Sequence, residues 1–248
     1  MMMYNMVYNM TKTKVEYASE NITVYPSCPF KCRYCWAAQP LWRKRICNPH
    51  PLQEAVRLRN ARKPRIIVIS FTSDPYPWQE QIYRLTRQVL QLLALSKVKH
   101  RVMVLTKCCL VKRDFDVLKE NDFWLGMTLT STKHIEDEPF ADSNPYRIKT
   151  LQEAHEEGIS TWSSLEPWLP RITNPVEIIK ETHTFIDFYV LGRLNYAKRF
   201  GYDVPDGYYK EELPKAVELL DRLKKDYIIK KELRACLGAP TVSHVNYA

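Results

Sequence analysis

The sequence lacks any long hydrophobic run: no stretch approaches the roughly 20 apolar residues that a helix needs to cross a bilayer. Its first fourteen residues also lack the apolar core and the small-residue cleavage site of a secretory signal. We therefore expect a soluble protein with no membrane partner and with a loose N-terminal arm over residues 1–14. No internal repeat or low-complexity linker divides residues 15–248, which favours a single domain with a C-terminal helical and strand extension.

The seven cysteines do not suit a secreted disulfide framework, because their number is odd. Three of them, Cys28, Cys32 and Cys35, fall within eight residues, which is typical of a metal site in a reducing compartment. The expected location is therefore the cytoplasm.

Positive charge is in excess and unevenly distributed. The 37 Lys and Arg residues outnumber the 28 Asp and Glu residues and give a formal net charge of +9. Eight of the basic residues lie between Arg43 and Arg65, where Glu54 is the one acidic residue. This stretch is either a solvated helix face or a contact for nucleic acid, since a basic field attracts polyanions.

Short β-branched runs alternate with segments of helical apolar spacing, the pattern of βα units around a parallel sheet. The predicted strands are residues 21–25, 65–71, 101–107, 123–130, 160–166 and 185–192. The predicted helices are residues 51–62, 79–96, 113–120, 145–157 (with Asn144 as a cap), 175–182 and 209–225. The apolar run over residues 227–233 fits a seventh strand or an edge element. Such a chain closes partly into a barrel or stays open, and either way its ligand site belongs at the carboxyl ends of the strands.

The cysteine triplet follows directly after the first predicted strand, with three and then two residues between the thiols. Four-iron clusters usually take four thiolates, so a loop with three leaves one iron open to another ligand. The alternative is a zinc site made by the same cysteines with Cys47 or His50, since zinc requires four tetrahedral ligands.

This spacing resembles the radical S-adenosylmethionine superfamily, and further motifs resemble its spore photoproduct lyase-related branch. These motifs are Thr72-Ser73-Asp74-Pro75-Tyr76-Pro77 with Glu80, Leu105-Thr106-Lys107, Arg113-Asp114, and Glu138-Pro139-Phe140-Ala141 with Arg147. The resemblance implies an α/β fold, a partial (β/α)6 barrel. It also implies a 4Fe-4S cluster on Cys28, Cys32 and Cys35, with S-adenosylmethionine chelating the fourth iron. Its reductive cleavage, fed by a low-potential donor such as flavodoxin or ferredoxin, yields a 5′-deoxyadenosyl radical that abstracts hydrogen from a substrate.

Further candidate cofactor contacts are chosen by their positions near strand ends: Ser73, Asp74, Lys107, Thr130, Ser131, Arg147, Ser164 and Glu166. Ser73 and Asp74 suit the cofactor amino group, although Ser-Asp-Pro is also turn chemistry, and the glycine-glycine-glutamate form of this motif is absent. Lys107 and Arg147 suit its carboxylate, and the others suit ribose hydroxyls. Cys108 is either a hydrogen donor to a product radical or a buried, inert cysteine.

Aromatic residues near the predicted strand ends, together with the basic stretch, favour a nucleic acid or nucleotide as substrate and partner, because bases stack on aromatic rings. A protein, peptide or small-metabolite substrate is the alternative within the same chemistry. A zinc-stabilised nucleic-acid-binding module without catalysis is the alternative from another class.

Overall fold

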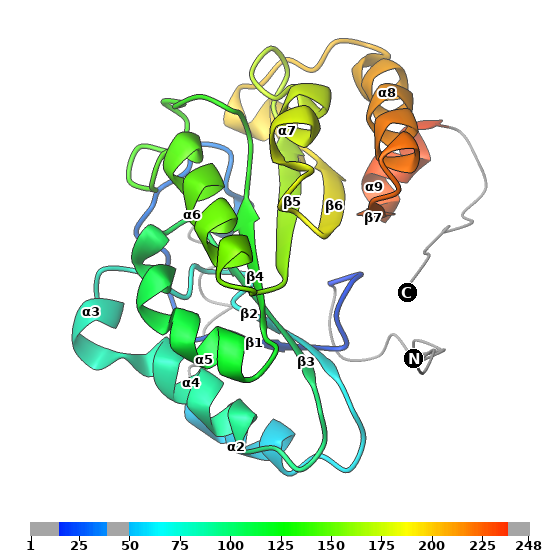
Figure 1. Cartoon of the computed structure of the whole chain (residues 1–248). Helices are drawn as coiled ribbons and strands as arrows, with labels where there is room; N and C mark the ends of the chain where they lie inside the picture. The colour runs from blue at the N-terminus through cyan, green and yellow to red at the C-terminus, as the bar shows by residue number, and fades with distance from the viewer. Residues whose placement is uncertain (1–14, 39–49, 238–248) are drawn as a thin grey trace.

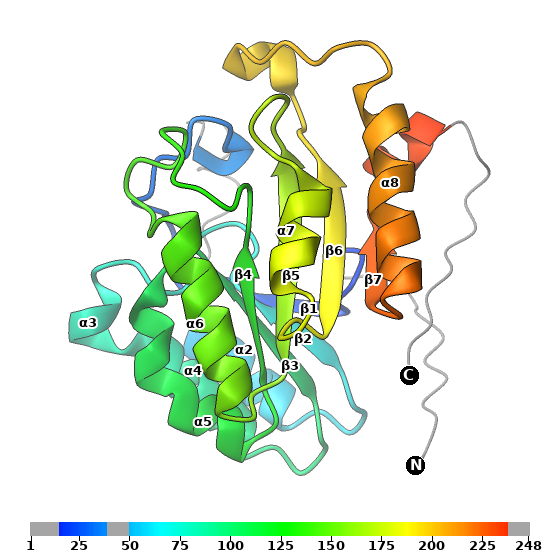
Figure 2. The same ribbon diagram turned by 45° about the horizontal axis from the view of Figure 1, so that its top comes forward.

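In the computed structural model of this chain, residues 15–38 and 50–237 are described. Outside these ranges lie the predicted N-terminal arm and residues 43–49 of the basic stretch, which include Cys47. Strands and helices alternate along the chain, and the helices lie on the outer side of a curved sheet (Figures 1 and 2). None of the helices in the described ranges combines the length and the hydropathy required to cross a membrane.

One sheet holds seven strands, all parallel and in the same order as in the sequence. The strands are β1 (Glu20–Ile22), β2 (Ile66–Ile69), β3 (Arg101–Thr106), β4 (Trp124–Thr128), β5 (Thr161–Trp168), β6 (Phe188–Arg193) and β7 (Asp226–Ile229). The predicted α/β partial barrel is confirmed. Because all seven strands are parallel, their carboxyl ends lie at one edge of the sheet, where ligand sites of such folds lie.

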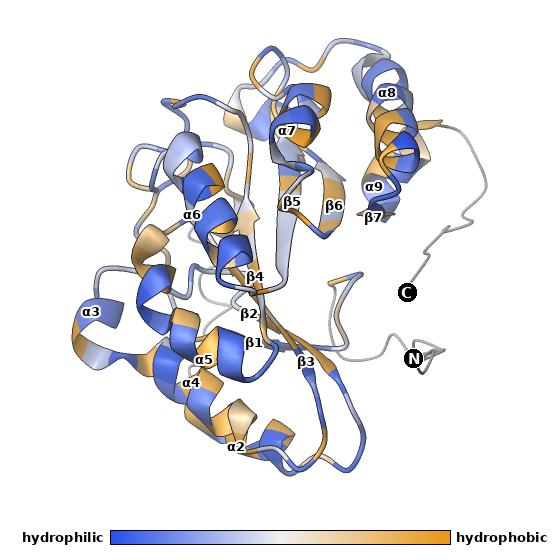
Figure 3. Cartoon of the chain, in the orientation of Figure 1, coloured by the Kyte–Doolittle hydropathy of each residue, from blue (hydrophilic) through white to orange (hydrophobic). Residues whose placement is uncertain are grey.

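Helices connect the strands and cover the outer face of the sheet. They are α2 (Pro51–Arg59), α3 (Glu80–Tyr83), α4 (Leu85–Ala94), α5 (Phe115–Glu120), α6 (Asn144–Glu156), α7 (Pro175–Thr182), α8 (Tyr208–Arg222) and α9 (Lys231–Arg234). Short 3-10 turns are η1 (Trp36–Ala38), η2 (Cys109–Asp114), η3 (Ala197–Phe200) and η4 (Ala235–Leu237). Along these helices polar and apolar residues alternate in patches (Figure 3), as expected when one face packs on a sheet.

The prediction of one helix over residues 79–96 is wrong. The helix is interrupted at Arg84, whose φ of 50° lies in the left-handed region. α4 begins after it in a new direction. The carboxylate of Glu80 accepts hydrogen bonds from the backbone N–H groups of Thr86 (2.9 Å) and Arg87 (3.3 Å). A side chain from α3 thus caps the start of α4, which stabilises the break.

Two further predictions about helix ends needed correction. Asn144 is not a cap: it is the first residue of α6, and its buried amide binds the backbone of Thr130 and Lys133 at 3.1 and 3.2 Å. The seventh strand anticipated over residues 227–233 is present as β7, but it ends at Ile229 and α9 follows.

Two apolar layers stabilise the sheet. The outer layer packs the strands against the helices. The inner layer fills the concave side with Tyr17, Val68, Trp162, Phe188 and Ile228, among others. Gly126 is required here, because a Cβ at this position would lie 2.1 Å from the Trp162 ring. We call the concave side of the sheet the lumen. Its amino-terminal part is closed by these packed side chains.

Candidate functional site

The three clustered cysteines lie in the loop that follows β1. Cys28, Cys32 and Cys35 belong to one apolar cluster with Phe30 and Tyr34. A backbone hydrogen bond of 3.0 Å from Cys35 to Cys32 closes the turn between the last two thiols. The triplet therefore points into a shielded environment at the carboxyl edge of the sheet.

The loop after β4 fixes this cysteine loop in place. The backbone N–H of Arg33 donates to the carbonyl of Asp137 at 2.9 Å, and the Tyr34 hydroxyl donates to the Glu138 carboxylate. Tyr202, from the loop after β6, donates to the Asp137 carboxylate. The position of the thiols thus depends on segments more than a hundred residues away in sequence.

Arg147 is the centre of a buried ion pair beneath these loops. Its side chain is fully buried and forms an ion pair with Glu138, which also accepts from Tyr34. Its Nε and Nη1 donate to the carbonyls of Asp142 and Thr128, both at 2.7 Å. Because all three guanidinium nitrogens are engaged inside the protein, the geometry favours a positioning role for Arg147.

Lys107 lies near the cysteine triplet and the Glu138 carboxylate. Its Nζ is 5.7 Å from the centroid of the Tyr34 ring. Burial lowers its pKa, but the charges of Cys32 and Glu138 outweigh burial and raise the pKa above its ordinary value. Lys107 is therefore a cation available to an anionic group near the thiols.

Burial raises the pKa of the Cys28 thiol to about 12 and that of Cys32 to about 11. Thiolates, not thiols, bind metals, so loading this loop must release protons. In the described ranges, no three His, Cys, Asp or Glu side chains lie close enough to share a single metal ion. In an iron–sulfur cluster each thiolate binds an iron of its own, so its ligands are more widely spaced than those of one ion.

Ser73 and Asp74 tie the ends of the first three strands together. Asp74 accepts from the Tyr76 backbone (2.8 Å), the Thr106 hydroxyl (2.7 Å) and the Lys107 backbone (2.7 Å). The Ser73 hydroxyl donates to the carbonyl of Tyr25 at 2.7 Å. The turn chemistry anticipated for this motif is present, and a cofactor contact would have to be made in addition to these bonds.

A second buried network joins the loops after β2 and β3. Arg113 contacts Glu80 at 2.6 Å and Asp114 at 2.8 Å, and both carboxylates are fully buried. Arg87 reaches Asp114 at 2.9 Å, and Tyr25 donates to Glu80. Glu80, Arg113 and Asp114, which belong to the motifs of the resemblance, are thus bonded to one another.

The remaining predicted contacts lie at the ends of β4 and β5. Thr130 is buried and lies 3.3 Å from Glu138, whereas the Ser131 hydroxyl accepts from the Lys133 backbone at 3.1 Å. Ser164 lies on the same side of β5 as Trp162, which places it on the lumen side. Glu166 follows on that side.

Cys108 lies in the same apolar cluster as the cysteine triplet. Its backbone N–H donates to the Thr106 hydroxyl at 2.9 Å, and burial raises the pKa of its thiol. The structure brings it near the candidate cluster loop, as a neutral thiol.

Sequence reasoning did not identify Lys230 as a site residue. Its Nζ donates to Glu166 at 2.6 Å, inside the lumen. A lysine directly after the apolar strand residues Tyr227 to Ile229 was the signal that could have indicated it.

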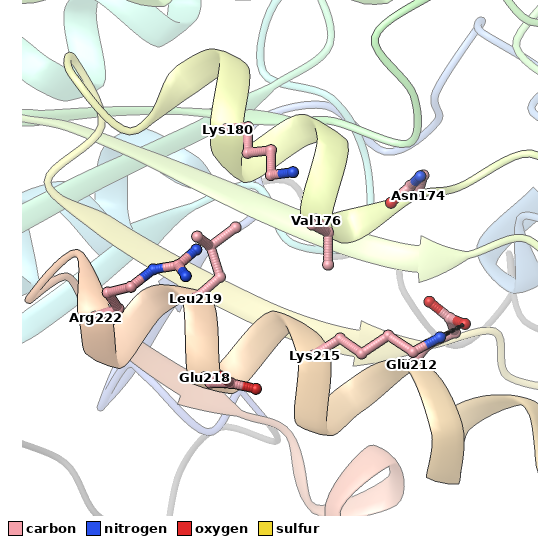
Figure 4. A pocket seen from close by; sticks show the side chains of 8 residues that line it. All are labelled: Asn174, Val176, Lys180, Glu212, Lys215, Glu218, Leu219 and Arg222. Atoms are coloured by element: carbon pink, nitrogen blue, oxygen red, sulfur yellow. Dashed lines mark hydrogen bonds and ion pairs between the residues drawn. The ribbon is translucent and has the colours of Figure 1, made fainter.

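A groove of about 500 Å³ lies between α7 and α8, and Figure 4 shows the side chains that line it. Lys180 and Arg222 line it together with the ion pair of Lys215 and Glu212 (2.7 Å). None of the predicted site residues lines this groove.

Comparison with known proteins agrees with this geometry. A sequence model of the Radical SAM superfamily matches residues 22–180. An uncharacterized protein of Methanocaldococcus jannaschii is 28% identical over 194 residues, which are 74% of this chain and 73% of that protein.

Two solved structures share the fold. SuiB of Streptococcus suis bound to the precursor peptide SuiA matches with a TM-score of 0.63 and 16% identity, over 88% of this chain and 50% of SuiB. This chain thus spans half the length of SuiB. A spore photoproduct lyase mutant with bound AdoMet and dinucleoside spore photoproduct matches with a TM-score of 0.63 and 14% identity, over 84% of this chain and 75% of that one. At these identities the likeness concerns the fold alone.

Proposed function

Because this chain belongs to the radical S-adenosylmethionine superfamily, whose members use a 4Fe-4S cluster and S-adenosylmethionine, we propose that Cys28, Cys32 and Cys35 hold that cluster. When bound, the two groups supply reductive cleavage of the sulfonium and a carbon-centred radical. The observation that carries the assignment is the gathering of three thiols in one loop after β1, inside a single apolar cluster. The donor set fits, since thiolates are the usual ligands of iron–sulfur clusters.

The residues around the thiols have separate tasks in this proposal. Lys107 binds the cofactor carboxylate, because it is a cation beside the cysteines with no ion-pair partner among the described residues. Ser73 and Asp74 contact the amino group in addition to their backbone bonds. Thr130, Ser131 and Ser164 serve the ribose from the ends of β4 and β5. Cys108 is the candidate hydrogen donor, since it shares the apolar cluster of the triplet.

Glu138 and Arg147 hold the cysteine loop rather than the cofactor. Their ion pair is buried, and Tyr34 connects it to the backbone between Cys32 and Cys35. Fixing the loop in this way keeps the reacting groups in position, which lowers the entropic cost of reaction.

We infer a nucleic acid or nucleotide as the substrate. Its support is the net charge of +9 and the likeness of the fold to a lyase crystallised with a dinucleoside. A peptide substrate is the second candidate, favoured by the equal TM-score of SuiB with its peptide. The zinc-stabilised module without catalysis is not carried forward, because the superfamily match spans the cysteine loop and five of the seven strands, β1 in part and β2 to β5 in full.

An external low-potential electron donor, such as a flavodoxin or ferredoxin, completes the proposal. The cytoplasm is the compartment that suits an unpaired cysteine triplet.

The test is anaerobic reconstitution with iron and sulfide, followed by reduction and measurement of 5′-deoxyadenosine formed from S-adenosylmethionine. Cys32→Ala should lose stable iron binding and all cleavage, whereas Cys236→Ala, at a cysteine remote from the triplet in sequence, should retain both. Equal iron in the two variants would contradict the ligand assignment.

A further inference from the structure

The lumen contains an ion pair to which the proposed function gives no role, although the sequence alone predicts that Glu166 contacts the cofactor ribose. Lys230, directly after β7, donates to Glu166 of β5 at 2.6 Å, and the side chains are 9% and 19% exposed. Gly192 of β6 lies between them, and a Cβ there would be 2.6 Å from the Glu166 carboxyl carbon. β5, β6 and β7 are neighbours in the sheet (Figure 1), so three adjacent strands contribute residues to this position.

The pair faces the lumen and not the outer helices. Lys230 Nζ lies 5.1 Å from the centroid of the ring of Phe71, the second residue after the end of β2. β2 and β7 share no hydrogen bonds in the sheet, so this contact crosses the concave side. Beneath the pair lie Trp162 and Tyr17, whose rings are 5.3 Å apart. The ion pair therefore lies on the carboxyl-terminal side of the apolar residues that fill the lumen.

Hydrogen-bonding capacity at this position is unused. Glu166 Oε2 accepts from Lys230, whereas Oε1 has no hydrogen-bond partner among the described residues. An ammonium carries three N–H donors, of which one is used here. The Tyr17 hydroxyl is also buried without a hydrogen-bond partner in the described ranges. The lumen thus offers a free acceptor and free donors side by side.

Stability does not explain this arrangement. A largely buried ion pair costs much of its attraction in desolvation, and apolar residues of similar volume are often as stable or more so. By contrast with Arg147, whose nitrogens are all engaged, this pair keeps unused hydrogen-bonding groups and its side chains are partly exposed. A polar pair with unused donors and an unused acceptor, inside a barrel whose carboxyl edge carries the thiols, has the properties of a ligand contact.

Resting on the proposed function, we propose that Glu166 and Lys230 bind the substrate through a nucleobase whose ring N–H lies beside a carbonyl. The carboxylate accepts from the N–H, and the ammonium donates to the carbonyl oxygen. A backbone peptide group fits less well, because in a trans peptide the N–H and C=O point in opposite directions. Glu166 therefore serves the substrate and not the ribose of the cofactor.

The experiment measures binding to the reconstituted protein with S-adenosylmethionine present. The probes are short oligothymidylate and an oligomer of equal length built from N3-methylthymidine, which has the same charge and rings but no N–H. We expect the wild-type protein to prefer oligothymidylate by about tenfold, the discrimination typical of one good two-point base contact.

The double variant Glu166→Gln/Lys230→Met should reduce this ratio to about one. It leaves no unpaired buried charge, which guards against simple unfolding. Lys215→Met is the control, because it also removes one positive charge from an ion pair, on the outer face of α8. The control should retain the preference.

Three outcomes would overturn the inference: no preference in the wild-type protein, a preference that survives in the double variant, or binding of an unstructured peptide in place of both oligomers. The proposed function is judged separately. Cleavage of S-adenosylmethionine by the wild-type protein without any probe effect supports the radical chemistry and removes only the assignment of Glu166 and Lys230.

Discussion

The carboxyl ends of β1 to β4 and those of β5 to β7 use charged side chains in different ways. On the first side, Glu80, Asp114, Glu138 and Arg147 are buried and bonded to each other or to backbone groups. On the second side, Glu166 and Lys230 form one contact and keep further hydrogen-bonding capacity. A saturated network, whose hydrogen-bonding groups are all used, holds the loops in place. A partly exposed, unsaturated pair with unused donors and an unused acceptor can bind a ligand. This difference separates positioning residues from candidate ligand contacts.

The largest effect should come from breaking a saturated network. Arg147→Met leaves Glu138 buried without its ion-pair partner, so we expect a loss of about 3–5 kcal/mol in the free energy of unfolding. The midpoint of urea denaturation measures it. Glu138→Gln/Arg147→Met should recover part of the loss, since no unpaired charge remains. A change below about 1 kcal/mol in the single variant would sink the positioning role.

A smaller effect is expected from crowding the unsaturated pair. Gly192→Ala places a Cβ against the Glu166 carboxylate, which should lower stability by about 1–3 kcal/mol and abolish discrimination between the two oligomers. Iron content should not change, because the cysteine loop is untouched.

The matched control is Gly158→Ala. Here the backbone is left-handed, with a φ of 86°, and an added Cβ meets nothing within 4 Å. It should cost about 1 kcal/mol through backbone strain and leave discrimination intact. If both variants lose discrimination equally, general destabilisation explains the loss and the comparison fails.

The smallest effect concerns the exposed rim of the second network. The Arg87 guanidinium holds the pKa of the Asp116 carboxyl at about 2, below its ordinary value of 3.8. A lowered pKa stabilises the folded state above pH 4, and the contribution is lost as the pH falls from about 4 to 2. Asp116 is half exposed, so the effect is less than about 1 kcal/mol.

Asp116→Asn tests this by difference. The stability of the wild-type protein minus that of the variant should be positive at pH 7 and approach zero near pH 2. A difference that does not change with pH would mean that the carboxylate charge does not contribute.

Local patterns in the sequence predicted much of the fold. Continuous apolar runs separated by helical spacing predicted the parallel sheet, and the triplet of cysteines after the first run predicted where the thiols lie. The failures have physical causes. The helix over residues 79–96 breaks because Glu80 caps α4 from outside it, and Asn144 is drawn into the interior by Thr130. Such contacts leave no periodic signal.

The sequence by itself determined the parallel architecture and the cysteine loop, because strand propensity, apolar periodicity and ligand spacing are properties of short segments. Only the tertiary structure determined which charged groups pair with each other and which keep unused hydrogen-bonding capacity. Arg147 meets Glu138, and Lys230 meets Glu166 across 64 residues, only because curvature brings their strands and loops together. Pairing between distant groups depends on strand order and close approach, and no local pattern encodes it.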